Sequence, residues 1–286
     1  MKKRLALILV LALCLAMLCA CGAEYEVTVI DDNGERTEAM KKGASIPDGS
    51  LVYTEDGDVF YAEGYKLRSP VRGIIYDAPE KTVMDAARLA EAALDEGRRV
   101  MLIYIDGLGW QSFESAVADG AVPCLAGLSY ERAAAVYPTI TPVNYAVMVT
   151  GRPPKTTGVT KRGIHQLSCE TIFDYAAERG LTSFASEGDT QILALPGAVL
   201  ELSPDLNGNG TGDDEIFGCA MESRDGCDLI FVHFHSVDDA SHENGPGSAE
   251  ARQALEQADK WCAELMDGFD GLVIVTADHG QHEQDG

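Results

Sequence analysis

The sequence predicts an α/β fold with a largely parallel sheet flanked by helices, preceded by a small β-rich N-terminal region. From about residue 80 onward, apolar segments typical of strands buried on both faces alternate with segments of helical periodicity. Residues 24–75 instead show short alternating strands separated by turn signals. These observations predict a β-rich region at residues 21–78 and an α/β domain at residues 79–286, which at roughly 200 residues can bury a full core.

Residues 1–20 are typical of an export signal. Three basic residues at positions 2–4 precede an apolar segment over residues 5–18, which is shorter than the roughly 20 residues that a membrane span requires. The sequence Leu-Cys-Ala-Cys at residues 18–21 resembles a bacterial lipobox, which implies a lipoprotein signal peptide and a lipid on Cys21. An ordinary signal peptide cut nearby is the alternative. Both interpretations predict an extracytoplasmic protein, and the lipobox predicts one that is lipid-anchored to the bacterial cell membrane.

The composition restricts the partners of the protein. Asp and Glu number 46 against 22 Lys and Arg, which gives a net charge of −24 at pH 7. Because such a chain repels nucleic-acid backbones, no nucleic-acid partner is expected. An anionic substrate needs a local cation, and a bound metal ion supplies one. No CxxC pair is present, so the cysteines beyond the export segment are expected to be mostly buried thiols.

In the β-rich region, strands are predicted at residues 25–30, 51–54 and 59–61, with an Asp-Asp-Asn-Gly turn signal at residues 31–34. Two roles are open for this region. It is either a spacer between a lipid anchor and the α/β domain, or an additional edge of the main sheet.

In the α/β domain, the apolar segments and the helical stripes follow one another in the order expected for a parallel sheet. Strands are predicted at Arg99–Ile105, Leu181–Ala185, Asp228–His235 and Gly271–Thr276. Helices are predicted at Thr82–Leu94, Ser112–Ala118, Pro142–Val149, Glu170–Glu178, Asp213–Met221 and Ser248–Met266.

Carboxylate and imidazole side chains follow three of these strands. Asp106 comes directly after the first strand, Asp278 and His279 come after the last, and Asp238 and His242 follow the third at a spacing of about one helical turn. Each one alone is as well explained as a turn former or a surface polar residue. Because the carboxyl ends of parallel strands meet at one edge, the set together favours a metal-dependent hydrolase with two divalent ions.

Thr141 stands directly before Pro142, which suits the first position of a helix and makes Thr141 the predicted N-cap. A helix start favours a phosphate or sulfate group. An ordinary capping threonine is the simplest explanation of an isolated Thr-Pro pair. A threonine hydroxyl becomes a nucleophile only when activated, and a divalent metal supplies that activation, as it does when it lowers the pKa of bound water from 15.7 to about 7.

Residues 141–144, Thr-Pro-Val-Asn, followed by Val-Thr-Gly at residues 149–151, resemble the nucleophile segment of the type I phosphodiesterase/nucleotide pyrophosphatase branch of the alkaline phosphatase superfamily. The resemblance covers about residues 99–280. It implies an alkaline phosphatase-like core and a hydrolase of phosphoric esters, of the phosphodiesterase or pyrophosphatase type, with two zinc ions. The substrate class implied is a small-molecule phosphate ester.

The resemblance also implies residue roles. Thr141 would be the nucleophile, and Asn144 would bind a phosphoryl oxygen. One zinc would be held by Asp106, Thr141, Asp278 and His279, and the other by Asp238 and His242. A third histidine completes the second site in the family, so the α/β domain is expected to be truncated at its C-terminus. His282 is an alternative third ligand.

Two basic residues shortly after the nucleophile segment, Lys161 and Arg162, are candidates for contacting a non-bridging oxygen, and we assign Arg162 to substrate binding. Exposed surface charge is the alternative. If they face the site, a phosphate monoester becomes the better substrate, so a monoesterase of the same superfamily is a second functional hypothesis. The aromatic residue and the histidine usual in the nucleophile segment are replaced by Pro142 and Tyr145, which weakens any inference about a nucleotide.

Three further features remain. Residues Asp205–Asp213 resemble a calcium loop, but Ile216 stands where a bidentate carboxylate belongs, which favours an Asn/Gly turn before the next helix. The apolar surroundings of His233 and His235 favour core or supporting roles over metal ligation. A third hypothesis for function, besides the two hydrolases, is a catalytically incomplete surface-binding lipoprotein.

Overall fold

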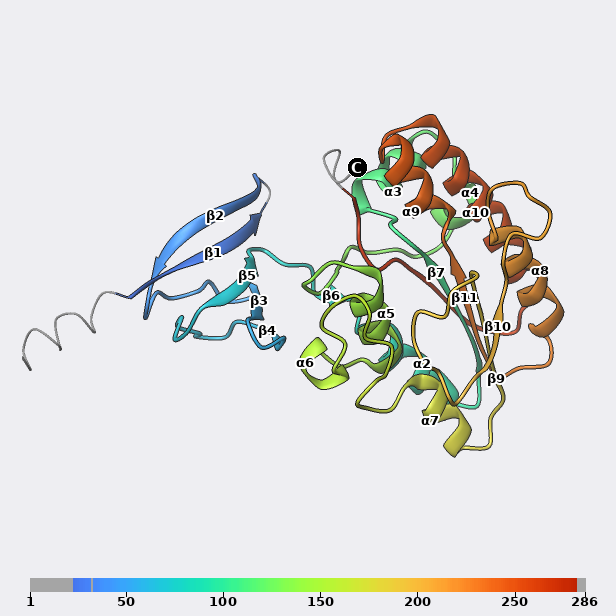
Figure 1. The fold of residues 1–286 in the computed structure, drawn as a ribbon, viewed down its shortest axis with the longest axis horizontal. Coiled ribbons are helices and arrows are strands. Elements are labelled where there is room, and N and C mark those ends of the chain that lie inside the picture. Colours follow the sequence, from blue (N-terminus) through green and yellow to red (C-terminus); the bar gives the residue numbers. More distant parts are fainter. Residues whose placement is uncertain (1–22, 32, 282–286) are drawn as a thin grey trace, which may run out of the picture. The chain divides into compact units, whose positions relative to one another are not determined.

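The computed structural model describes residues 23–31 and 33–281 (Figure 1). The chain divides into two compact units, Met1–Ala78 and Pro79–Gly286, and each is considered by itself. Within the described ranges, no helix combines the length and the apolar character needed to cross a membrane. The predicted export signal, the lipid site at Cys21 and the alternative ligand His282 lie outside the described residues.

The first unit forms a five-stranded sheet of its own, in the order β2-β1-β5-β3-β4. Its strands are β1 (Glu24–Asp31), β2 (Gly34–Lys41), β3 (Leu51–Thr54), β4 (Val59–Tyr61) and β5 (Val71–Ile75). Strands β1 and β2, which lie on either side of the predicted turn signal, pair antiparallel. The possibility that this region adds an edge to the main sheet is wrong, because none of its strands pairs with a strand of the second unit within the described residues.

The second unit contains the predicted parallel sheet, in the order β10-β9-β11-β7-β12. Its strands are β7 (Arg99–Ile105), β9 (Ser183–Glu187), β10 (Val199–Leu202), β11 (Leu229–Phe234) and β12 (Gly271–Thr276). All four neighbouring pairs are parallel. A separate parallel pair is formed by β6 (Lys81–Thr82) and β8 (Ala133–Ala134). The predicted fold class is confirmed.

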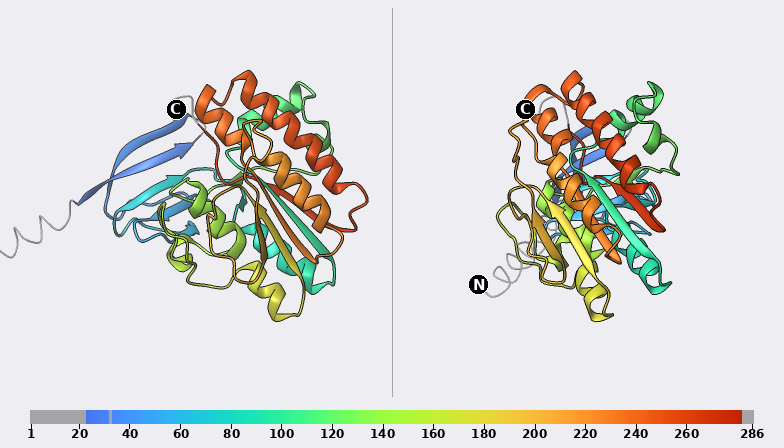
Figure 2. Two further views of the ribbon diagram at one scale, coloured as in Figure 1. Left: turned by 45° about the vertical axis from the view of Figure 1, so that its right-hand side comes forward. Right: turned by 90° about the vertical axis from the view of Figure 1, so that its right-hand side faces the viewer.

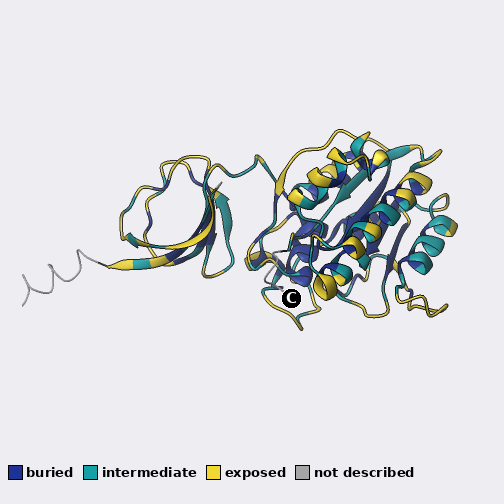
Figure 3. Ribbon diagram, turned by 90° about the horizontal axis from the view of Figure 1, so that it is seen from above, coloured by how far each residue is buried: buried dark blue, intermediate teal, exposed yellow. Residues whose placement is uncertain are grey.

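Helices cover both faces of the main sheet (Figure 2). They are α2 (Asp85–Asp95), α3 (Trp110–Ala118), α4 (Pro123–Ala126), α5 (Thr141–Thr150), α6 (Pro154–Thr157), α7 (Ile172–Glu178), α8 (Asp213–Ser223), α9 (Ser236–Asn244) and α10 (Ala249–Met266). On one face α4, α8 and α9 contact α10, and on the other α2, α5 and α7 contact one another. The inner strands β7, β9 and β11 are the buried centre of the unit (Figure 3).

Alternate residues of β7 face opposite layers, as expected for a strand buried on both faces. Met101, Ile103 and Ile105 pack in the core beneath α10, so Tyr104 points to the opposite face. By the same alternation, Phe234 packs beneath α10, while His233 stacks with Tyr104 on the other face. The face that holds Tyr104 and His233 is therefore the one covered by α5.

Two local predictions differ from the structure. Helix α5 begins at Thr141, with Ile140 as its N-cap, so Thr141 is the first helical residue and the predicted N-cap assignment is wrong. Proline then occupies the second helical position, where it still costs no helix hydrogen bond. Strand β10 was missed because its four residues lie at the sheet edge and are largely exposed, which leaves no buried apolar segment to recognise.

Candidate metal centre

The register of the main sheet brings the predicted ligands to one edge. Ile105 pairs with Phe234 of β11, and Tyr104 pairs with Thr276 of β12. The next residues along these three parallel strands therefore leave the sheet side by side. They lead to Asp106 after β7, to helix α9 after β11, and to Asp278 and His279 after β12. This is the edge where α/β proteins place their ligand sites.

Four side chains converge here, and we call them the buried ligand group: Asp106, Thr141, Asp278 and His279. The Nε2 atom of His279 lies 3.2 Å from Asp278 Oδ2, 3.4 Å from Thr141 Oγ1 and 3.6 Å from Asp106 Oδ1. Ligands at 2.0–2.2 Å around a tetrahedral ion stand about 3.3–3.6 Å apart. The spacing therefore suits one shared divalent ion.

The electrostatics of the buried ligand group also fit a cation. Burial raises the pKa of Asp106 well above its usual value, and the neighbouring carboxylates of Asp278 and Asp238 raise it further. Among the described residues, Asp106 Oδ1 and Asp278 Oδ2 are buried with no hydrogen-bond partner. Buried carboxylates without partners are costly, and a metal ion removes that cost by binding their free oxygens.

Asp238 and His242 form a second candidate site on helix α9, which we call the helix pair. Asp238 Oδ2 lies 3.4 Å from His242 Nε2, one helical turn away. Gln281 donates from Nε2 to the backbone oxygen of Asp238 and to its Oδ1 atom. Within residues 23–31 and 33–281, no further His, Cys, Asp or Glu completes a three-ligand cluster with this pair.

The helix pair and the buried ligand group adjoin each other at Gly107. Its backbone N–H donates to Asp278 Oδ1 at 3.2 Å. A Cβ atom at Gly107 would lie 2.5 Å from Asp238 Oδ1, and the residue has a φ of +68°. Only glycine fits both the space and the backbone conformation here, which explains why the Ile-Asp-Gly sequence carries a glycine directly after Asp106.

Comparison with known proteins gives the family. Residues 100–179 and 170–285 match the sequence profile of type I phosphodiesterase / nucleotide pyrophosphatase. The chain belongs to this family. The match covers the strand ends and helix starts that supply both sets of ligands, so the sequence-based resemblance is confirmed. No match was found among curated protein sequences.

A solved structure of a phosphonoacetate hydrolase shares the fold of this family member at low identity. Phosphonoacetate hydrolase from Sinorhizobium meliloti 1021 in complex with phosphonoformate has a TM-score of 0.52 and 18% identity, over 83% of this chain and 60% of that chain. The same enzyme in complex with phosphonoacetate has a TM-score of 0.52 and 18% identity, over 85% of this chain and 62% of that chain. Murine ectonucleotide pyrophosphatase / phosphodiesterase 5 has a TM-score of 0.48 and 17% identity, over 64% of this chain and 57% of that chain. The family member thus spans about 60% of the length of the hydrolase.

In this family member, Thr141 is the first residue of helix α5. All ten residues of α5 are buried. One turn after Thr141, the hydroxyl of Tyr145 donates to Oε1 of Glu187, the last residue of β9. Burial raises the pKa of Glu187 to about 7, although the bond from Tyr145 opposes the rise. Helix α5 is therefore tied to the sheet edge through a buried carboxyl group.

Asn144 differs from the role that the resemblance implied. Its side chain is fully buried. Its Oδ1 accepts from the backbone N–H of Val136 at 2.7 Å, and its Nδ2 donates to the carbonyl oxygens of Val136 and Pro138 at 3.0 and 3.3 Å. The amide therefore forms hydrogen bonds to the segment that leads into Thr141 and supports that segment. The expected contact of Asn144 with a phosphoryl oxygen does not fit this geometry.

The basic residues lie outside the converging groups. Lys161 and Arg162 are exposed on the segment between α6 and α7. His165 lies near them, with Nδ1 2.8 Å from the carbonyl oxygen of Ile192. None of these three side chains belongs to the buried ligand group or to the helix pair.

The predicted calcium loop is closed by its own hydrogen bonds. Asp205 accepts the backbone N–H groups of Gly208 and Gly210, and these bonds lower its pKa. Asp213 is buried and accepts the backbone N–H groups of His235 and Ser236 at 2.8 and 2.9 Å. With these carboxylates engaged, the segment has the geometry of an Asn/Gly turn that precedes α8.

Sequence reasoning missed Glu187 and Gln281 and did not anticipate the contacts of Asp213. The boundary of β9 was set two residues too early at both ends, which left Glu187 beyond the strand. Gln281 has no charge and no metal-binding pattern to mark it. The available signal for Glu187 was a carboxylate close to the end of a strand, two residues after the predicted strand, whereas Asp106 directly follows its strand.

Proposed function

We propose that this protein is a metal-dependent hydrolase of phosphoric esters, of the phosphodiesterase or pyrophosphatase type, with Thr141 as its nucleophile. Membership of the family supports the reaction class. The observation that carries the residue assignment is the position of Thr141 Oγ1, 3.4 Å from His279 Nε2 and within the same group as Asp106 and Asp278. A hydroxyl among metal ligands is where a nucleophile needs to be.

We propose two divalent ions, and imidazole with carboxylate ligands favours zinc. Asp106, Thr141, Asp278 and His279 would hold one ion, and Asp238 with His242 the other. When bound, the ions would lower the pKa of the Thr141 hydroxyl and neutralise charge on the phosphoryl group.

The position of α5 allows Thr141 to take part in both steps of the proposed reaction. Thr141 loses its proton, and its Oγ attacks phosphorus while the bond to the leaving oxygen breaks and that oxygen takes up a proton. A water molecule then attacks the phosphothreonine, which returns the hydroxyl of Thr141 and releases phosphate or its ester. The buried surroundings of α5 fix Thr141 for both steps.

The substrate that we propose is a small-molecule phosphate ester. Arg162 is the proposed contact to a non-bridging oxygen, and its movement into the site would favour a monoester dianion. We further propose an extracytoplasmic location and a membrane anchor through a lipid on Cys21, on the basis of the sequence of the export segment.

The test compares Thr141→Ala with Thr141→Ser, using zinc-loaded protein that starts at Ala23. Bis(p-nitrophenyl) phosphate and p-nitrophenyl phosphate serve as diester and monoester probes. Loss of the nucleophile should lower kcat/KM by at least about 1,000-fold, while the serine variant keeps measurable turnover. Unchanged turnover in Thr141→Ala at full zinc occupancy would overturn the proposal. Arg162→Ala should lower monoester turnover more than diester turnover.

A binding-only lipoprotein is the second candidate, because the helix pair supplies only two ligands within the described residues. Zinc occupancy below one ion per chain, together with binding of phosphate but no turnover of either probe, would favour it over the hydrolase.

A further inference from the structure

We propose that His233 and His235 are positioning residues that hold one oxygen of Asp106, Oδ2, and thereby reserve the other, Oδ1, for the metal. The inference rests on the metal site of the proposed function, and it does not depend on turnover. It also implies that the cluster of Asp106, His233 and His235 holds no third metal ion, although its donor atoms lie close enough to one another to bind one.

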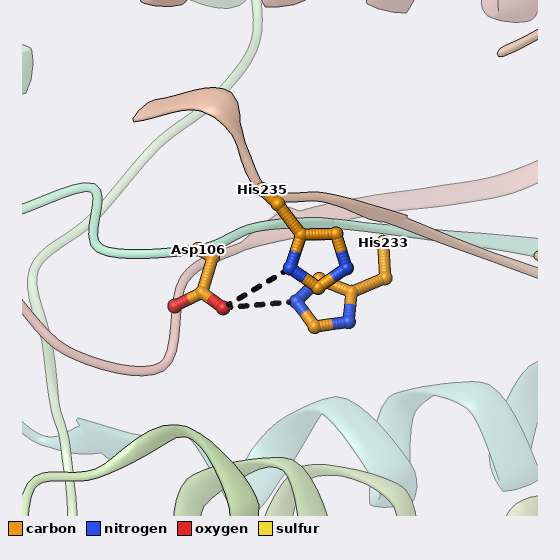
Figure 4. A group of neighbouring side chains, drawn as sticks. All are labelled: Asp106, His233 and His235. Atoms are coloured by element: carbon orange, nitrogen blue, oxygen red, sulfur yellow. Dashed lines mark hydrogen bonds and ion pairs between the residues drawn. The ribbon is translucent and has the colours of Figure 1, made fainter. Parts of the chain in front are cut away.

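The two oxygens of Asp106 have different surroundings. Oδ2 lies 3.1 Å from His233 Nε2 and 3.7 Å from His235 Nδ1, and both rings approach this one oxygen (Figure 4). Oδ1 lies 3.6 Å from His279 Nε2 and has no hydrogen-bond partner among the described residues. The two histidines therefore hold Oδ2 of Asp106, while Oδ1 has no hydrogen-bond partner among the described residues and lies next to His279 of the buried ligand group.

The hydrogen bonds assign the ring protons. The backbone N–H of Gly188 donates to His235 Nε2 at 3.3 Å, so that nitrogen presents a lone pair and the ring proton sits on Nδ1, facing Asp106. His233 Nε2 is within hydrogen-bond distance of the Asp106 carboxylate and therefore carries its proton as well. A protonated ring nitrogen cannot bind a metal, so both histidines present donors, and only His233 is close enough for a direct bond.

Packing fixes both rings. His233 is fully buried and stacks on Tyr104 with ring centroids 3.8 Å apart and planes 10° apart. The ring of His235 lies 3.8 Å from that of His233. The backbone of His235 is held in turn by the buried carboxylate of Asp213 at 2.8 Å. A supporting layer with so little freedom can prevent Asp106 from rotating.

The physical consequence is a metal affinity that depends on the histidine pair. With the donors in place, Oδ1 of Asp106 is presented in one orientation. Without them, the carboxylate can rotate and loses the hydrogen bond that stabilises its charged form. Removal of partners that orient metal ligands typically lowers metal affinity 10–100-fold.

The experiment measures zinc stoichiometry by elemental analysis and zinc affinity by competition with a chromophoric chelator. His233→Leu removes the donor, while His233→Gln keeps a donor near the position of Nε2. We expect no more than two zinc ions per wild-type chain, a 10–100-fold loss of affinity in His233→Leu, and affinity within about threefold of wild type in His233→Gln. The matched control is His165→Ala, which removes an exposed imidazole that belongs to neither the buried ligand group nor the helix pair and should leave zinc binding unchanged.

His235→Ala provides a second variant, because this side chain is partly exposed and its truncation should spare the fold if His233→Leu unfolds. It should weaken zinc binding by a smaller factor. Equal affinity in both variants and wild type would overturn the positioning role. Three zinc ions per wild-type chain, with the third lost in His235→Ala, would show a metal site instead. Since no substrate is used, failure of the Thr141 variants to lose turnover would leave these results unaffected.

Discussion

The buried ligand group and the helix pair differ in how the chain builds them. The first draws its side chains from the ends of β7 and β12 and from the start of α5, and its Asp106, Asp278 and His279 side chains are all at least nine-tenths buried. The second draws both its side chains from one turn of α9, and the His242 side chain is 45% exposed. The buried ligand group is therefore set by the tertiary fold and the helix pair by local helix geometry.

This difference indicates which parts of the fold hold the side chains of each site in place. Ligands on separate strands cannot move without disturbing the sheet, so the buried ligand group is held in place before a metal arrives. Ligands on one helical turn have the correct spacing but little support from the rest of the fold. We therefore expect the buried ligand group to bind zinc more tightly, and the helix pair to respond more readily to small changes around it.

The largest effect should come from a ligand of the buried group. Asp278→Ala removes a fully buried oxygen donor and should lower zinc affinity at this site and kcat/KM by at least about 1,000-fold. His242→Ala removes an exposed ligand and should cost about 10–100-fold in affinity at the helix pair. Chelator competition on both variants checks the order. Equal losses would mean that burial does not distinguish the two sites.

The link between α5 and the sheet should appear in the pH dependence of stability. Burial raises the pKa of Glu187 from 4.5 to about 7, so the folded state binds a proton more tightly than the unfolded state does. The resulting stabilisation is fully present below pH 4.5 and is lost as the pH rises through about 7. At about 1.4 kcal/mol per pKa unit, the change is on the order of 3 kcal/mol.

Urea unfolding of metal-free protein between pH 4.5 and 8 would measure this change in the free energy of unfolding. Glu187→Gln keeps the shape and a hydrogen-bonding group, and its pH profile should be flatter than that of wild type by about 3 kcal/mol. Asp106 also has a raised pKa, so only the difference between the two profiles belongs to Glu187. Identical profiles would show that Glu187 does not titrate in this range.

Much of the fold could be predicted from the sequence because most strands are apolar. Continuous apolar segments predicted β7 and β12 at the residues observed, Arg99–Ile105 and Gly271–Thr276, although β12 lies at the sheet edge and is only partly buried. The same logic failed for β10, whose side chains are mostly exposed. The helix boundary at Thr141 was off by one residue because proline is compatible with either of the first two helical positions.

The candidate site could be predicted where charged residues follow apolar strands, as at Asp106 and Asp278. It could not be predicted where the role of a side chain depends on partners that are distant in the sequence. Nothing in the sequence near Asn144 indicates that Val136 and Pro138 use its amide, and the contact between Gln281 and Asp238 joins residues 43 positions apart. Family resemblance supplied residue types, and only the folded structure supplies the partners of each side chain.

The closeness of the two sites can be tested at Gly107. Gly107→Ala should cost about 1–2 kcal/mol for a positive φ and lose a further 10-fold or more in zinc affinity, because the new Cβ would lie 2.5 Å from Asp238 Oδ1. Gly97→Ala is the matched control, with a φ of +73° and no atom within 4 Å of the added Cβ. Both variants should lose the stability that a positive φ costs, Gly107→Ala should lose more because of its contacts with Asp238, and only Gly107→Ala should lose zinc affinity. A loss of zinc affinity in both would mean that backbone strain alone is responsible.

The smallest effect is expected at Gln281, which supports the helix pair from outside α9. Its amide donates to the backbone oxygen and to Oδ1 of Asp238, so Gln281→Ala frees the Asp238 carboxylate without removing a ligand. Because hydrogen bonds of this kind contribute about 1 kcal/mol, zinc affinity at the helix pair should fall about fivefold while the buried ligand group is unchanged. Gln281→Glu places a negative charge beside Asp238, which attracts a cation, so zinc affinity at the helix pair should rise above that of wild type. No change in either variant would mean that α9 alone fixes Asp238.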